Sequence, residues 1–111
     1  METNREEVRI KQDTQEKVIE RSIEYVRSFY CLPSVKFMNE IPMMKYIAIY
    51  SIAAAFGFSK WSICRRFDFG ARNSYNLIKK INILMERHSE FKEQIEFLIH
   101  LLKENETNQT P

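Results

Sequence analysis

The sequence predicts an all-α fold, a compact domain of about five helices around one hydrophobic core. Its 111 residues include only 2 glycines and 3 prolines, which leaves few of the residues that form sharp turns. Apolar residues recur at intervals of three and four along several segments, as they do on the buried face of a helix. We divide the chain into a polar N-terminal arm or frayed helix (1–17), a helical domain (18–103) and a disordered tail (104–111).

An amphipathic helix is expected over residues 18–30, where apolar side chains follow helical spacing. Pro33 ends it, because the residue before a proline disfavours the helical conformation. Residues 31–41 then form a connector, in which Asn39 can cap the helix that follows. Pro42 fits the first turn of that helix, where its missing N–H does no harm.

The next helix, over residues 43–56, is apolar on nearly every side. A helix of this kind is surrounded by others, so we expect it at the centre of the domain. Gly57 is its expected left-handed stop, because glycine adopts positive φ at little cost. Toward the C-terminus we expect a helix over 71–87 and, after a cap at Ser89, a last helix with an apolar stripe: Phe91, Ile95, Leu98, Ile99 and Leu102.

Residues 59–81 have the layout of a helix-turn-helix, in which a bracing helix precedes one that enters the major groove of DNA. Ser59 can cap the bracing helix, Trp61 is a candidate for burial, and Gly70 allows a sharp turn. Ser74 is the weak position, since a β-branched apolar residue is commoner there. An ordinary helical bundle is the alternative. The small and apolar positions of the motif are filled by Ile63, Cys64, Phe67, Phe69, Leu77, Ile78 and Ile81.

In a helix-turn-helix, the outward face near the start of the second helix meets the bases. Arginine can donate two hydrogen bonds to guanine, and asparagine can pair with adenine. Capping, packing and ordinary solvation are alternative roles for the same side chains. The candidates for base contacts are Arg72, Asn73, Ser74, Tyr75 and Asn76, and those for phosphate contacts are Ser59, Lys60, Lys79 and Lys80.

Positive charge is concentrated in the same region. Residues 60–88 hold 7 basic and 2 acidic side chains, although the whole chain carries a net charge of only +2. A local positive field favours phosphate binding, because each neutralised phosphate releases counterions. A solvated basic face is the alternative. On the first helix Glu16, Glu20 and Glu24 line one edge, which we interpret as a solvated face.

The segment from Lys45 to Ile81 resembles the C-terminal DNA-binding domain of the bacterial replication initiator DnaA. Lys45-Tyr46-Ile47-Ala48-Ile49-Tyr50 matches a family block in which Ile-Ala-Met-Tyr follows a basic residue. Residues 59–67 match the family's short bracing helix at its Ser, Ile and Phe positions. With its flanking helices the resemblance covers about 85 residues and lacks the family's ATPase domain. It implies a Trp-repressor-like fold and supports Lys45 as a phosphate contact and Arg72 as a DNA contact.

The sequence departs from that family where the family reads bases. Arg72-Asn73-Ser74-Tyr75 stands in place of Asp-His-Thr-Thr. The family's basic loop, which enters the minor groove, corresponds to residues 34–41, where only Lys36 is basic. We therefore expect the scaffold to carry over and the initiator's target sequence to differ.

The sequence offers no constellation typical of an enzyme. His88 and His100 have no nucleophile or second ligand in register, and there is no glycine-rich phosphate loop, so we expect no catalytic residue, cofactor, metal or small-molecule substrate. Cys31 and Cys64 lack the spacing of a zinc site, and we expect both to be buried, reduced thiols in a cytoplasmic protein. Neither a secretion signal nor an apolar run of about 18 residues is present, so no membrane is expected.

These observations predict a non-catalytic, cytoplasmic protein that binds double-stranded DNA. It would regulate transcription or replication, or serve as an accessory of a mobile element. The alternative is a protein–protein interaction module on the same scaffold that has lost specific DNA readout. The apolar stripes of residues 18–30 and 91–102 fit a core and also fit the seam of a homodimer, and both interpretations stay open.

Overall fold

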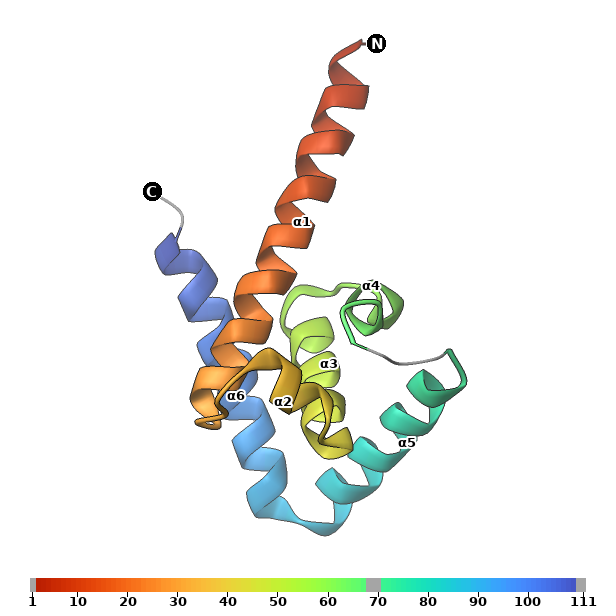
Figure 1. The fold of residues 1–111 in the computed structure, drawn as a ribbon, viewed down its shortest axis with the longest axis vertical. Coiled ribbons are helices and arrows are strands. Elements are labelled where there is room, and N and C mark those ends of the chain that lie inside the picture. The colour runs from red at the N-terminus through yellow and green to blue at the C-terminus, as the bar shows by residue number, and fades with distance from the viewer. Residues whose placement is uncertain (1, 68–70, 110–111) are drawn as a thin grey trace.

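The protein is all-helical, as the sequence predicts. The computed structural model describes residues 2–67 and 71–109, and the side chains of residues 14–67 and 75–108. Within these residues the chain forms helices and no strand (Figure 1). The elements are α1 (Glu2–Phe29), α2 (Val35–Asn39), α3 (Pro42–Phe56), α4 (Lys60–Cys64), α5 (Ala71–Arg87) and α6 (Ser89–Gln109).

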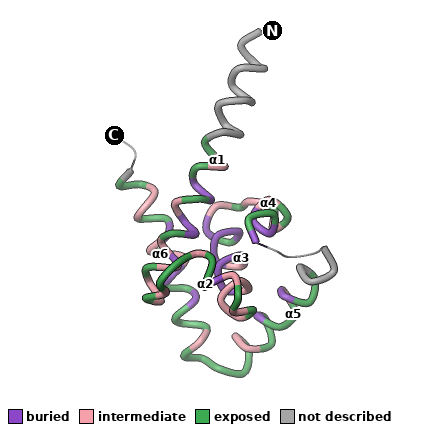
Figure 2. The backbone as a smooth tube through the Cα atoms, viewed as in Figure 1, coloured by how far each residue is buried: buried purple, intermediate pink, exposed green. Residues whose placement is uncertain are grey.

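Helix α3 is the centre of the fold. It packs against each of the other helices, with α6 as its most extensive partner. Its side chains are apolar on almost every side, and Ala48, Ile49 and Ile52 have no exposed surface. Figure 2 shows buried residues on α3 and on stretches of α1, α4, α5 and α6. The expectation that residues 43–56 form the central helix is confirmed.

Helix α1 is continuous from Glu2 to Phe29, so its backbone has no break at the boundary expected near residue 18. Its first turns extend beyond the other helices (Figure 1). Its C-terminal half buries Ile19, Ile23 and Val26, as the helical spacing of the apolar residues predicts.

The connector after α1 contains a short helix that the sequence reading leaves out. In α2 the Ser34 side chain accepts a hydrogen bond from the Phe37 N–H, at 3.0 Å, and Met38 is fully buried. Asn39 ends α2 and is not the cap of α3, so that expectation is wrong. The residue in the N-cap position of α3 is Ile41, which makes no side-chain capping bond, and Pro42 occupies the first turn as expected.

Two helices end on a residue with positive φ. Gly57 (φ 69°) ends α3, and its N–H donates to the Ala53 carbonyl at 2.8 Å, which confirms the expected stop. Cys31 (φ 56°) ends α1, where the Cys31 and Leu32 N–H groups donate to the Ser28 and Arg27 carbonyls at 3.0 Å. A residue with a Cβ adopts this conformation at a cost of about 1–2 kcal/mol. Cys31 is exposed, so the expectation of two buried thiols holds for Cys64 alone.

Helix α6 continues past residue 103, where we expected a disordered tail to begin. Its last turns run on to Gln109. They are held on α1 by an ion pair between Arg21 and Glu106, in which Nε of Arg21 donates to Glu106 Oε2 at 3.2 Å. Of these polar residues, Glu106 therefore has a partner on another helix.

Candidate nucleic-acid interface

The short helix α4 is held by its buried face. Ile63 and Cys64 have no exposed surface and Phe67 is 5 % exposed, so all three belong to the core. The Ser59 side chain accepts a hydrogen bond from the Ser62 N–H at 3.4 Å, which confirms it as the cap. Trp61 is 52 % exposed, contrary to the burial considered for it.

Helix α5 has one apolar and one polar face. Leu77 and Ile81 are fully buried, with Ile78 partly buried beside them. Opposite them Tyr75 is 73 % exposed, and Asn76, Lys79 and Lys80 are exposed too. Positions 75, 76, 79 and 80 fall on one side of a helix because its period is about 3.6 residues. We call this stripe (Tyr75, Asn76, Lys79 and Lys80) the outer face of α5.

The other candidates for base contacts lie in residues 71–74, for which the structure describes the backbone alone. The backbone of residues 71–74 belongs to the first turn of α5. The side chains of Arg72, Asn73 and Ser74 lie outside the described residues, and so does the expected turn at 68–70. Tyr75 and Asn76 are therefore the base-contact candidates for which the structure gives an exposure.

The candidates for phosphate contacts lie on three helices, α3, α4 and α5. Lys45 lies in the first turns of α3 and is partly buried. Nζ of Lys80 lies 5.8 Å from the centre of the Tyr46 ring, which brings α5 against that end of α3. Ser59 and Lys60 begin α4 beyond the other end, after Gly57. The 15 residues of α3 cover about 22 Å, so the set is extended and not a compact pocket.

Two arginines of the basic region face carboxylates of α1. Nη1 of Arg66 donates to Glu20 Oε1 at 2.9 Å, and Arg66 also binds Glu16. Arg65 Nη2 lies 3.8 Å from Glu16 Oε1. Glu16 and Glu20 keep 39 % and 62 % of their side chains exposed, as expected of a solvated face, and both carboxylates also pair with arginines. Their local charge is balanced, so the positive field of residues 60–88 is weaker than the sequence count suggests.

Sequence reading missed these pairs because the partners are far apart in the chain. Glu20 and Arg66 are 46 residues apart, and Glu16 and Arg66 are 50 apart. The available signal was two carboxylates one helical turn apart, at positions 16 and 20, and two adjacent arginines at 65 and 66. Glu24, the third carboxylate of that edge, pairs with Arg27 within α1 at 2.8 Å.

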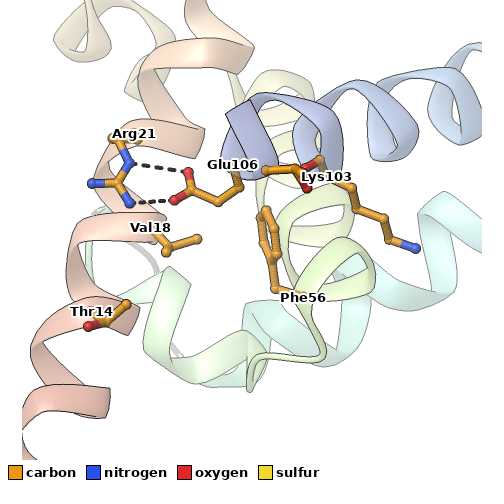
Figure 3. Close-up of a pocket in the computed structure, with 7 residues that line it drawn as sticks. Thr14, Val18, Arg21, Phe56, Lys103 and Glu106 are labelled. Carbon is orange, nitrogen blue, oxygen red and sulfur yellow. Dashed lines mark hydrogen bonds and ion pairs between the residues drawn. The ribbon is translucent and has the colours of Figure 1, made fainter. Parts of the chain in front are cut away.

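A hollow of the described surface lies elsewhere, between α1, α6 and the end of α3 (Figure 3). Val18 and Phe56 form its apolar part, and the ion pair of Arg21 with Glu106 crosses one side of it. The carboxylate of Glu106 is thus engaged by a guanidinium. This hollow does not bring together any of the residues that the sequence predicts as contacts.

The histidines and cysteines form no metal centre among the residues described. No group of three or more His, Cys, Asp or Glu side chains that could hold a metal ion occurs in that part of the chain. His100 Nε2 lies 3.0 Å from Glu104 Oε1 on the exposed side of α6. Burial raises the pKa of the Cys64 thiol, which keeps it protonated.

None of the helices, over the residues that are described, is both long and apolar enough to cross a membrane. Comparison of the chain with protein-family models, with curated proteins and with solved structures found no match.

Proposed function

We propose that this protein binds double-stranded DNA through the outer face of α5 and catalyses no reaction. The observation that carries the proposal is that face: a tyrosine, an asparagine and two lysines, all exposed, on a helix whose opposite side is fixed in the core. A rigid helix that presents hydrogen-bonding and cationic side chains suits the major groove, which admits one helix.

In this proposal α4 and α5 form a helix-turn-helix. Helix α4 packs on α3 and on α5, as a bracing helix does, and its start offers Ser59 and Lys60 to a phosphate. Asn76 and Tyr75 would meet bases together with Arg72, Asn73 and Ser74. Lys45, Lys79 and Lys80 would meet phosphates on both sides of the groove.

The resemblance to the DNA-binding domain of DnaA supports the same assignment, and it extends to Lys45 and Arg72. The replaced Asp-His-Thr-Thr means that the target sequence is this protein's own. A non-catalytic DNA binder of this size suits a regulator of transcription or replication, or an accessory of a mobile element. A homodimer would let two weak half-sites act together.

A protein-interaction module on the same scaffold is the second candidate. The pairing of Arg65 and Arg66 with Glu16 and Glu20 favours it, because it removes positive charge from the region that would face DNA. The two candidates differ in one respect that is easily measured. Only the first predicts an affinity for DNA that depends on salt.

The test is fluorescence anisotropy of a labelled random-sequence duplex at several salt concentrations. We expect binding at low salt that weakens steeply as salt rises, because phosphate contacts release counterions. Lys79→Ala and Arg72→Ala should both weaken binding, and Lys79→Ala should reduce the salt slope by about 0.9.

Lys103→Ala is the matched control, since Lys103 is exposed on α6 and its loss changes the net charge equally. We expect it to bind as the unaltered protein does. No binding at low salt, or equal losses from Lys79→Ala and Lys103→Ala, would contradict the proposal and favour the interaction module. If the unaltered protein binds, a selection from random duplexes would identify the target site.

A further inference from the structure

Arg65 and Arg66 lie at the end of α4, the proposed bracing helix. They directly follow α4, between the buried residues Ile63 and Phe67. The Arg65 and Arg66 N–H groups donate to the carbonyls of Trp61 and Ile63, at 3.2 and 3.0 Å. The backbone is thus anchored, while the side chains are 59 % exposed for Arg65 and 29 % exposed for Arg66.

The present partners of these arginines are two carboxylates one helical turn apart on α1. Glu16 lies against both guanidinium groups, and Glu20 lies against that of Arg66 alone. Helix α1 packs mainly on α3, α2 and α6, and these ion pairs connect it to the residues that follow α4. The cluster has two positive and two negative groups and no net charge.

A guanidinium that holds a carboxylate can also hold a phosphate. Its planar donors match the oxygens of both groups, and both bonds are charge-assisted. The Glu16 and Glu20 side chains are 39 % and 62 % exposed, and ion pairs exposed in this way contribute little to stability. Replacing the carboxylates by a phosphate therefore costs little stability.

We propose that Arg65 and Arg66 are a second phosphate-binding point, for which Glu16 and Glu20 compete with the DNA backbone, so that a duplex gains these two contacts in full only when the carboxylates lose their charge. This inference rests on the proposed DNA binding and deepens it. Helix α1 then acts as an internal competitor: its carboxylates lower the affinity for any duplex. Sequence preference stays with the outer face of α5.

The decisive variant is the double substitution Glu16→Gln with Glu20→Gln. It keeps the shape of both side chains and removes the charges that compete with phosphate. We expect tighter binding to a random duplex and a salt slope steeper by up to about 1.8, from two added phosphate contacts. Between 50 and 200 mM salt the variant should then lose about tenfold more affinity than the unaltered protein.

Two matched variants make the result specific. Glu93→Gln with Glu96→Gln, on the exposed side of α6, changes the net charge equally and should leave the salt slope unchanged. Adding Arg65→Ala and Arg66→Ala to the Glu16 and Glu20 substitutions should return the slope to that of the unaltered protein. Circular dichroism of each variant confirms that it remains helical.

Equal effects from the two glutamate pairs, or weaker binding after Glu16→Gln with Glu20→Gln, would overturn the inference. Weaker binding would mean that the ion pairs position α4. In either case binding by the unaltered protein would leave the proposed function standing. Failure of the unaltered protein and of every variant to bind DNA would overturn the proposed function and this inference with it.

Discussion

The inner and outer faces of α5 differ in what holds their residues in place. Leu77 and Ile81 on the inner face are fully enclosed by the core. On the outer face Tyr75 and Asn76 stand in solvent, although they belong to the same helix. Selection for folding acts on the first pair, whereas folding leaves the identity of the second pair free. Tyr75 and Asn76 can therefore be changed without loss of the fold.

The largest effect is expected on the inner face. Leu77→Ala should lower the free energy of unfolding by about 2–5 kcal/mol, because it removes buried methyl groups and leaves a cavity. Urea denaturation followed by circular dichroism measures this loss. Ile83→Ala is the control on the same helix, because Ile83 is 37 % exposed and should lose much less. Equal losses at the two sites would remove the distinction between the faces.

Asn76→Ala, on the outer face, should leave stability nearly unchanged and weaken base discrimination. The free energy of unfolding should change by no more than about 0.5 kcal/mol, since the side chain is exposed. Discrimination at one base pair should fall by about 1–3 kcal/mol, the contribution of a bidentate contact between asparagine and adenine. Binding to the selected target and to single-base variants of it measures this. If the variant discriminates between base pairs as the unaltered protein does, Asn76 does not contact a base.

The smallest effect, on stability, is expected at Lys80, which contacts Tyr46 of α3. Lys80→Met keeps the apolar stem of the side chain and removes the charge that lies over the Tyr46 ring. We expect a loss of stability of about 0.5 kcal/mol, as for an exposed cation–π contact. Lys79→Met lacks that contact and should lose less by the same denaturation measurement. A larger loss from Lys79→Met would mean that the ring contact contributes nothing.

The sequence predicts the elements whose reason for folding is local. The apolar composition of residues 43–56 predicts α3 as the central helix. The helical spacing of apolar residues in 71–87 predicts which side of α5 is buried. Helix α2 was missed because its 5 residues are too few to show a period, and its cap at Ser34 was the available signal. The ion pair of Glu106 could not be predicted in this way, because its partner Arg21 lies 85 positions away in the chain.

The candidate site was predicted in the same uneven way. Exposure of Tyr75 and Asn76 followed from helical spacing, since Leu77 and Ile81 fix which side is buried. The pairing of Arg65 and Arg66 with carboxylates could not be predicted from helical spacing, because it depends on which surface of α1 passes near the end of α4. A count of charges along the chain adds residues that are neighbours in sequence. The electrostatic field at a surface depends instead on which charges are neighbours in the folded structure.

The exposed thiol at the end of α1 supplies a built-in attachment point. Thiol-reactive dyes couple to the thiolate, which is scarce at Cys64 because burial raises its pKa and blocks access. Cys31 stands in solvent on the connection between α1 and α2. A fluorophore placed there reports tumbling of the unaltered chain while α4 and α5 keep their native surface.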